Sequence, residues 1–253
     1  MTRRTLPLIL AYVFLIFTAL LLAPSIGHAQ SVTVDLGPGG QAGATGRLVQ
    51  LTALVTVLSL APSLLVMTTA FTRIVIVLSL LRSAIGAQGT PPNTVLIGLA
   101  LFLTFYVMQP TLEQAWERGV TPLAAGEVTE MEGLRRTAEP FHRFMAANVR
   151  GPDLQLFQDL GGLPAPAEPA QTSWRALIPA FMVGEMRRAF EMGFLLYLPF
   201  LVIDLVVGSV LMSLGMMMLP PNAVSLPFKL IFFVLVDGWR LVSGSLVQGF
   251  VPS

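Results

Sequence analysis

Long apolar segments separated by short turns dominate this chain. They run over residues 48–81, 94–108, 174–219 and 223–250. A helix of about 20 apolar residues is long enough to cross the roughly 30 Å hydrocarbon core of a bilayer. The pattern therefore predicts an all-α, membrane-associated fold built from two helical hairpins, over residues 48–109 and 174–253.

The first hairpin is interrupted by helix-breaking residues. Pro62 predicts a kink that separates a lead-in piece ending at Leu60 from a helix over Ser63–Arg82. The next run, Thr94–Met108, corresponds to only about 22 Å of helix, which is shorter than the hydrocarbon core. We expect it to end at Gln109–Pro110 and to be buried in protein.

Residues 110–173 differ from the rest because they have the composition of a soluble protein. Apolar positions at spacings near three, four and seven predict a helix over Glu127–Asn148, with Pro140 near its middle. The residues that form this pattern are Met131, Leu134, Phe141 and Met145. A shorter helix is expected over Pro152–Leu160, ended by the Gly- and Pro-rich linker that follows. We expect a small helical domain outside the membrane.

The N-terminal 29 residues have the form of a secretory signal peptide. Arg3 and Arg4 precede an apolar core over Leu6–Leu22, and small residues favour cleavage after Ala29. The alternative is an uncleaved anchor, because the apolar core is long for a signal. Residues 30–47 are expected to form a flexible lead-in. Together with the segment count, cleavage places both mature termini outside the cytoplasm.

Composition narrows the classes of function. Hydrophobic residues make up 54% of the chain and charged residues only 11%, which is typical of a membrane protein. The net charge of +1 and the absence of a basic face argue against a nucleic-acid partner. With no cysteine and with only His28 and His142 as imidazoles, we expect no metal, no cofactor and no enzymatic activity.

Charged residues within the apolar runs are the first candidate site. Each costs a few kcal/mol near the middle of a membrane and needs a partner there. For Arg73 the alternatives are a side chain that extends to the interface and an ion pair between helices or chains. The candidates for buried ion pairs are Arg73, Glu185, Asp204, Lys229, Asp237 and Arg240.

The second candidate site is the turn of the second hairpin, where Met216, Met217 and Met218 precede Pro220-Pro221. Adjacent residues of a helix are about 100° apart, so three in a row do not share one helical face. One interpretation is apolar filler, because methionine adapts to irregular gaps. The other is a deformable collar around a pore or a changing partner.

Two blocks of sequence resemble the FliP/SctR family of type III export-gate proteins. They are SLAPSLLVMTTAFTRIVIVLSLLRSAIGAQGTPPNTVLIGLALFLTFYVMQP and PFLVIDLVVGSVLMSLGMMMLPPNAVSLPFKLIFFVLVDGWRLVSGSL. The likeness runs from Ser59 to Ser245. The segments FTRIVIVLSLLR and TPPN are similar to those of the flagellar branch of the family. Residues 110–173 match more loosely, mainly at Phe144-Met145 and Leu156-Phe157.

The resemblance implies a pore-forming subunit that conducts unfolded flagellar proteins across the bacterial inner membrane. Several copies, a pentamer in this family, would join FliQ-like and FliR-like subunits and further export-apparatus proteins in a helical ring. The ring would belong to the flagellar basal body and be exposed to the periplasm, with hairpins largely raised to that side of the membrane.

The resemblance also assigns roles to individual residues. It implies a gasket inside the pore for Met216–Met218. An ion pair within or between subunits is implied for Glu185 and Lys229. Phe144 and Phe157 become candidates for packing between copies.

The sequence is also compatible with a function of another class. A proton-coupled or small-solute transporter would use the buried charges as a relay. Transporters often contain internal repeats and a polar site near the bilayer midplane. We detect no repeat here, and the prominent cluster is an apolar group of methionines. An enzyme within the membrane would need a nucleophile joined to a base, and no such motif occurs.

Overall fold

The computed structural model describes residues 66–250, except positions 88, 165–167, 169–170 and 217, and a few isolated positions between 52 and 63. The chain divides into two compact units, residues 1–55 and 56–253, and the description that follows concerns the second. The predicted signal peptide, the flexible lead-in and the kink at Pro62 lie outside the described residues. Their assignments stay predictions.

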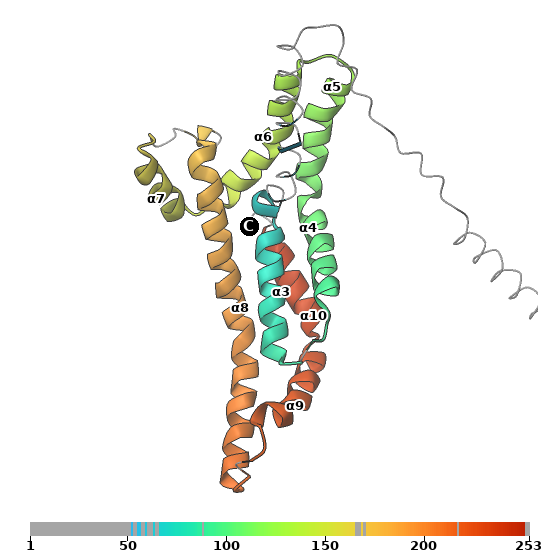
Figure 1. Ribbon diagram of the computed structural model, residues 1–253, viewed down its shortest axis with the longest axis vertical. Coiled ribbons are helices and arrows are strands. Elements are labelled where there is room, and N and C mark those ends of the chain that lie inside the picture. The colour runs from blue at the N-terminus through green and yellow to red at the C-terminus, as the bar shows by residue number, and fades with distance from the viewer. Residues whose placement is uncertain are drawn as a thin grey trace, which may run out of the picture. The chain divides into compact units, whose positions relative to one another are not determined.

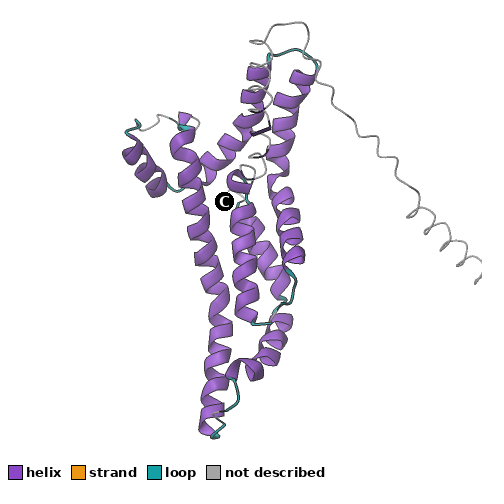
Figure 2. Cartoon of the chain, viewed as in Figure 1, coloured by secondary structure: helices purple, strands orange, loops and turns teal. Residues whose placement is uncertain are grey.

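The described residues form helices and turns, with no strand among them (Figure 2). This confirms the all-α prediction. Asn93–Ala124 and Trp174–Ser213 are long and apolar enough to cross a membrane, and the bent pair over Pro221–Gln248 is a third candidate. In chain order the elements are α3 (Phe71–Ile85), α4 (Asn93–Ala115), the π-helix η1 (Trp116–Val120), α5 (Thr121–Ala124), α6 (Glu130–Asn148), α7 (Gly151–Gly161), α8 (Trp174–Ser213), α9 (Pro221–Leu235) and α10 (Gly238–Gln248).

The core forms where α3 packs along α8 and against α4 (Figure 1). On α3 the fully buried apolar side chains recur at helical spacing, so that one face of the helix is apolar and enclosed. These residues are Ile74, Val77, Leu78 and Leu81. Gly193 lets the two helices approach closely, because a Cβ atom there would lie 2.2 Å from Cδ1 of Leu80. Helix α3 is therefore an inner helix of this unit.

Helix α3 begins later than the sequence predicted. The expected helix over Ser63–Arg82 is broken at Thr69–Ala70, and α3 starts at Phe71. The backbone N–H of Phe71 donates to the Thr69 hydroxyl at 3.4 Å, and the Thr72 hydroxyl donates to the Val66 carbonyl at 3.1 Å. Threonine hydroxyls compete in this way with the helical hydrogen bonds of the backbone.

Helix α4 is much longer than the predicted run over Thr94–Met108, because it passes through Pro110 and continues to Ala115. The predicted end at Gln109–Pro110 is wrong because the helix does not stop where the sequence ceases to be apolar. The polar extension is sustained by tertiary packing: α4 packs against α6, and Thr111 and Ala115 are buried. With η1 and α5, the helical path reaches Ala124.

The polar region contains both predicted helices, as α6 and α7. The N-terminus of α6 is capped by Thr129, whose hydroxyl accepts from the Glu132 backbone N–H at 3.4 Å. Of the periodic apolar residues, Met145 is fully buried, but Met131 and Leu134 are exposed. Helix α7 ends at Gly161 and is followed by Gly162, which adopts the left-handed conformation favoured by glycine.

The last apolar run is not one helix. It breaks between α9 and α10, whose axes differ by 62°. Asp237 has a φ of 51°, and a Cβ atom on Gly238 would lie 2.1 Å from Cε2 of Phe233. The bend therefore depends on a left-handed residue followed by a glycine that the Phe233 ring covers.

A first prediction concerns the contact between α6 and η1. A Cβ atom on Gly119 would lie 2.6 Å from the backbone nitrogen of Thr137 and 2.7 Å from its Cα. Because backbone atoms do not yield as a side chain does, Gly119→Ala should lower the free energy of unfolding by about 1–3 kcal/mol. Denaturant titration in detergent micelles, followed by circular dichroism, measures this loss.

The matched control is Gly98→Ala, in the same continuous helical stretch, where a Cβ atom would meet nothing within 4 Å. Alanine there should be neutral or stabilise by up to about 1 kcal/mol, because it reduces the entropy lost on helix formation. Equal destabilisation by both substitutions would contradict the close approach at Gly119.

A second prediction concerns pH and the first turn of α6. Hydrogen bonds from Arg135 and Arg136 lower the pKa of the Glu132 carboxyl from 4.5 to about 2. A carboxyl whose pKa is lower in the folded state stabilises that state fully above pH 4.5, and loses this contribution as pH falls towards about 2. The difference in thermal midpoint between wild type and Glu132→Gln should therefore narrow across that range.

The control for this titration is Glu130→Gln, which removes another carboxylate from the same first turn. It separates the effect of the arginine pair from the general preference for negative charge at a helix N-terminus. A midpoint difference for Glu132→Gln that stays constant from pH 7 to pH 2 would contradict the ion-pair account.

Candidate functional site

Arg73 and Glu185 form a buried ion pair between α3 and α8. Arg73 Nε donates to Glu185 Oε2 at 2.7 Å, and Arg73 Nη2 donates to Glu185 Oε1 at 2.5 Å. The two side chains are only 2% and 1% exposed. Two parallel N–H···O bonds use the planar fork of the guanidinium, which fixes both distance and orientation. The pair therefore specifies how α3 lies against α8.

Asp204 and Lys229 form a second pair, between α8 and α9. Lys229 Nζ donates to Asp204 Oδ2 at 2.6 Å, and the Ser225 hydroxyl donates to Asp204 Oδ1 at 2.5 Å. Lys229 Nζ also donates to the backbone carbonyl of Ala84 at 3.1 Å, in the last turn of α3. A cation at the C-terminal end of a helix also interacts favourably with the helix dipole.

The two ion pairs act on opposite ends of α3. Arg73 lies in its first turn, whereas Ala84 lies in its last. Both ends are thereby tied to α8, one directly through Glu185 and the other through Lys229 and Asp204. These four charges are thus neutralised between helices of one chain.

The structure does not bring every predicted partner together. Glu185 and Lys229, which the resemblance paired, take different partners within this chain. The carboxylate of Asp237 lies 4.0 Å from Arg240, but both side chains are exposed, so they do not form a buried pair. The sequence spacing of these two residues identified their proximity, but periodicity alone did not reveal their exposure.

Phe144 and Phe157, the candidates for packing between copies, are both half-buried in the single chain. The Phe144 ring lies 5.9 Å from Phe181 of α8 and 5.9 Å from Phe250, measured between ring centroids. Phe144 therefore has contacts of its own within the chain. A role for either residue between copies stays a proposal.

The methionine turn lies between α8 and α9 at the end of their hairpin (Figure 1). Met216 and Met218 are exposed, and Met218 is 98% exposed. Met217 is not among the described residues. Gly215 adopts a φ of 72°, which directs the chain out of α8. The turn thus presents flexible apolar side chains without enclosing them.

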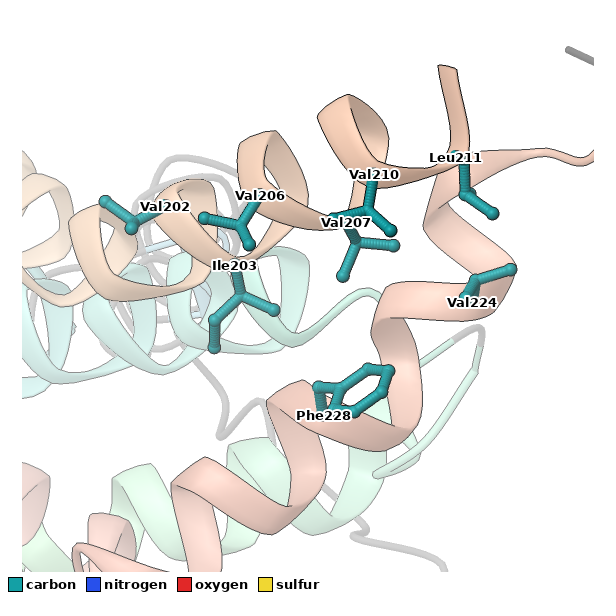
Figure 3. Close-up of a pocket in the computed structure, with 8 residues that line it drawn as sticks. All are labelled: Val202, Ile203, Val206, Val207, Val210, Leu211, Val224 and Phe228. Atoms are coloured by element: carbon teal, nitrogen blue, oxygen red, sulfur yellow. The ribbon is translucent and has the colours of Figure 1, made fainter. Parts of the chain in front are cut away.

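Beside this turn, α8 and α9 form an apolar groove of about 480 Å³. Figure 3 shows side chains of the two helices facing one another across it. The groove is lined by Val202, Ile203, Val206, Val207, Val210, Leu211, Val224 and Phe228. With no polar side chain in its lining, the groove suits apolar contacts and offers no group for chemistry.

Sequence reasoning missed the neutral partners of the buried charges. Backbone carbonyls of Ala84 and Gly249 accept hydrogen bonds from Lys229 and Arg73, and a backbone acceptor has no signal in a residue pattern. The sequence indicates Ser225 only weakly as a partner of these charges, because it is a polar residue one helical turn before Lys229. No group of three or more potential metal-ligating side chains occurs within the part of the chain that the structure describes.

A third prediction tests the buried pair. Glu185→Gln removes the negative charge and leaves the Arg73 guanidinium buried without its counter-ion. Breaking such a pair should lower the free energy of unfolding by about 3–5 kcal/mol. Denaturant titration in detergent micelles measures this loss.

The matched control is Glu191→Gln on the same helix. It removes an exposed carboxylate that pairs with Arg187 at 3.1 Å and lies 4.0 Å from Arg150. An exposed pair one helical turn apart contributes only about 0.3–0.5 kcal/mol. If both substitutions lower the free energy of unfolding equally, burial of the Arg73–Glu185 pair adds no stability. The assignment of this pair as a stabilising buried ion pair is then wrong.

Comparison with known proteins identifies the family. The model of the FliP family matches residues 54–246. Flagellar biosynthetic protein FliP of Caulobacter vibrioides is 58% identical over 228 residues, which are 90% of this chain and 85% of that protein. The proteins of that name from Rhizobium meliloti and Bacillus subtilis are 47% and 48% identical, over 92% and 80% of this chain and 96% and 91% of their own lengths. The chain therefore belongs to the FliP family, and is a membrane-associated component of the flagellar protein-export apparatus.

Proposed function

We propose that this chain is a pore-forming subunit of the flagellar type III export gate, which passes unfolded flagellar proteins across the inner membrane. The observation that carries the proposal is the methionine turn at the end of the α8–α9 hairpin. Its described methionines, Met216 and Met218, are exposed. Methionine side chains are flexible and apolar, so they adapt to different sequences and favour none in particular. Met216–Met218 would then close around a translocating chain, or around one another.

The exposed surface of the helices supports a role inside an assembly. Large apolar side chains remain exposed along α4, α8 and α9, while the buried charges have partners within the chain. We infer that copies of this chain, a pentamer by resemblance, and FliQ-like and FliR-like subunits cover part of this surface. The polar region containing α6 and α7 would face the periplasm at the flagellar basal body.

A transporter that uses the buried charges as a relay is the alternative. A relay requires groups that exchange partners or protons along a path. In this chain Arg73 and Asp204 instead each pair with a charge on another helix and so join two helices. We therefore assign these charges to the stability of the subunit.

A fourth prediction tests the gasket. Replacing Met216, Met217 and Met218 by alanine shortens all three side chains and should leave the pore incompletely closed. In cells carrying the assembled gate, the entry of a small impermeant dye should rise severalfold, because the short side chains no longer fill the opening. Co-purification of the other gate subunits reports whether assembly persists.

The control is Met131→Ala, which shortens a methionine that is 76% exposed on α6, away from the hairpin turn. Dye entry should stay at the wild-type level in this variant. Unchanged permeability in the triple variant, with the complex still assembled, would count against the gasket.

A further inference from the structure

The end of α10 covers the Arg73 guanidinium from two directions. The Gly249 carbonyl accepts a hydrogen bond from Arg73 Nη1 at 3.0 Å. The Phe250 ring lies over the guanidinium, with Arg73 Cζ 3.6 Å from the ring centroid. A cation stacked on an aromatic face in a desolvated site is held by electrostatic attraction as well as by apolar contact. The charged group is therefore both paired and covered.

Gly249 is suited to this position by its size. A Cβ atom there would lie 2.9 Å from Arg73 Nη1 and 3.3 Å from the Ser245 carbonyl oxygen. A larger residue would displace the guanidinium or the final turn of α10. The last carbonyls of a helix have no partner within that helix, so Arg73 also satisfies an acceptor that α10 leaves open.

The Phe250 ring also contacts the polar region of the chain. It stacks on Phe144 of α6 at an interplanar angle of 24°, and Phe144 meets Phe181 of α8 edge-on at 66°. These contacts form a continuous aromatic group, defined by Phe144, Phe181 and Phe250, which reaches the buried pair through Phe250. It joins α6 and α8 to the end of α10, which are distant in sequence.

The other end of α10 is attached differently. There the chain turns through the left-handed, exposed Asp237. The position of α10 thus depends on a bend at its start and on the contacts of Gly249 and Phe250 at its end, together with the buried Val242 and Leu246.

We propose that Gly249 and Phe250 form a lid that keeps water from the Arg73–Glu185 pair and couples α6 to α3. The pair needs such a lid, because Coulomb attraction weakens strongly when water reaches two charges. Phe250 acts as a positioning residue: its ring covers the guanidinium that pairs with Glu185, and the same ring stacks on Phe144.

The test is chemical labelling of arginine with phenylglyoxal, in the full chain purified in detergent and read by peptide mass spectrometry. In the wild type Arg73 should be almost unreactive, whereas Arg240, which is 87% exposed, reacts freely and serves as the internal reference. Phe250→Ala should raise the labelling rate of Arg73 by about thirtyfold, the order expected when a desolvated cation–π contact is lost and local opening becomes more frequent.

A second reporter separates lid opening from general unfolding. Lys229 is also buried, but it lies at the opposite end of α3, so an amine reagent should leave it as unreactive in Phe250→Ala as in the wild type. Phe228→Ala is the matched control: it removes an exposed phenylalanine of the α8–α9 groove and should leave Arg73 protected.

Phe144→Ala tests the coupling while leaving Phe250 in place. It should raise Arg73 labelling by a smaller factor, and the double substitution should raise it by less than the product of the two single effects, because the rings act as one group. The proposal is overturned if Arg73 stays unreactive without Phe250. It is equally overturned if Lys229 becomes reactive together with Arg73 in both single variants.

Discussion

A charge inside an apolar helix needs a counter-charge nearby, and this requirement determines how the helices of the chain pack. Arg73 meets Glu185 and joins α3 to α8, which are far apart in sequence, whereas Lys229 meets Asp204 within the α8–α9 hairpin and also donates to the last turn of α3. Removing one partner leaves a charge in surroundings that do not solvate it, so alternative packings of α3 carry a large cost. The two pairs therefore specify one position of α3 along α8. Apolar contacts alone would discriminate less between neighbouring positions.

This internal neutralisation leaves an outer surface that is largely apolar. Phe102, Phe105 and Tyr106 are exposed on α4, and the α8–α9 groove is wholly apolar. Lipid or neighbouring subunits cover such surfaces in a membrane protein. A subunit whose charges are satisfied internally is able to present apolar helices to copies of itself, which is what our proposal of an export gate requires. The exposed methionine turn then becomes the part that meets the substrate.

Much of the fold follows from residue patterns, and the differences have local physical causes. Apolar periodicity predicts α6 and α7. The long apolar runs on either side of the Met-Pro-Pro turn predict the hairpin of α8 and α9. Neither pattern predicts the continuation of α4 past Pro110, which depends on tertiary packing. Likewise, the sequence marked Arg73 and Lys229 as charges in need of partners, but backbone carbonyls and the Phe250 ring carry no such signal.

The central claim is that this chain is built to assemble, and the most direct test is native mass spectrometry of the detergent-extracted protein. It should be expressed alone and then together with FliQ-like and FliR-like subunits. Our account predicts a discrete homo-oligomer that gains mass in fixed increments as those subunits are added. A monomer or dimer whose mass is indifferent to them would contradict the account, and the buried charges would then have to be examined as a transport path.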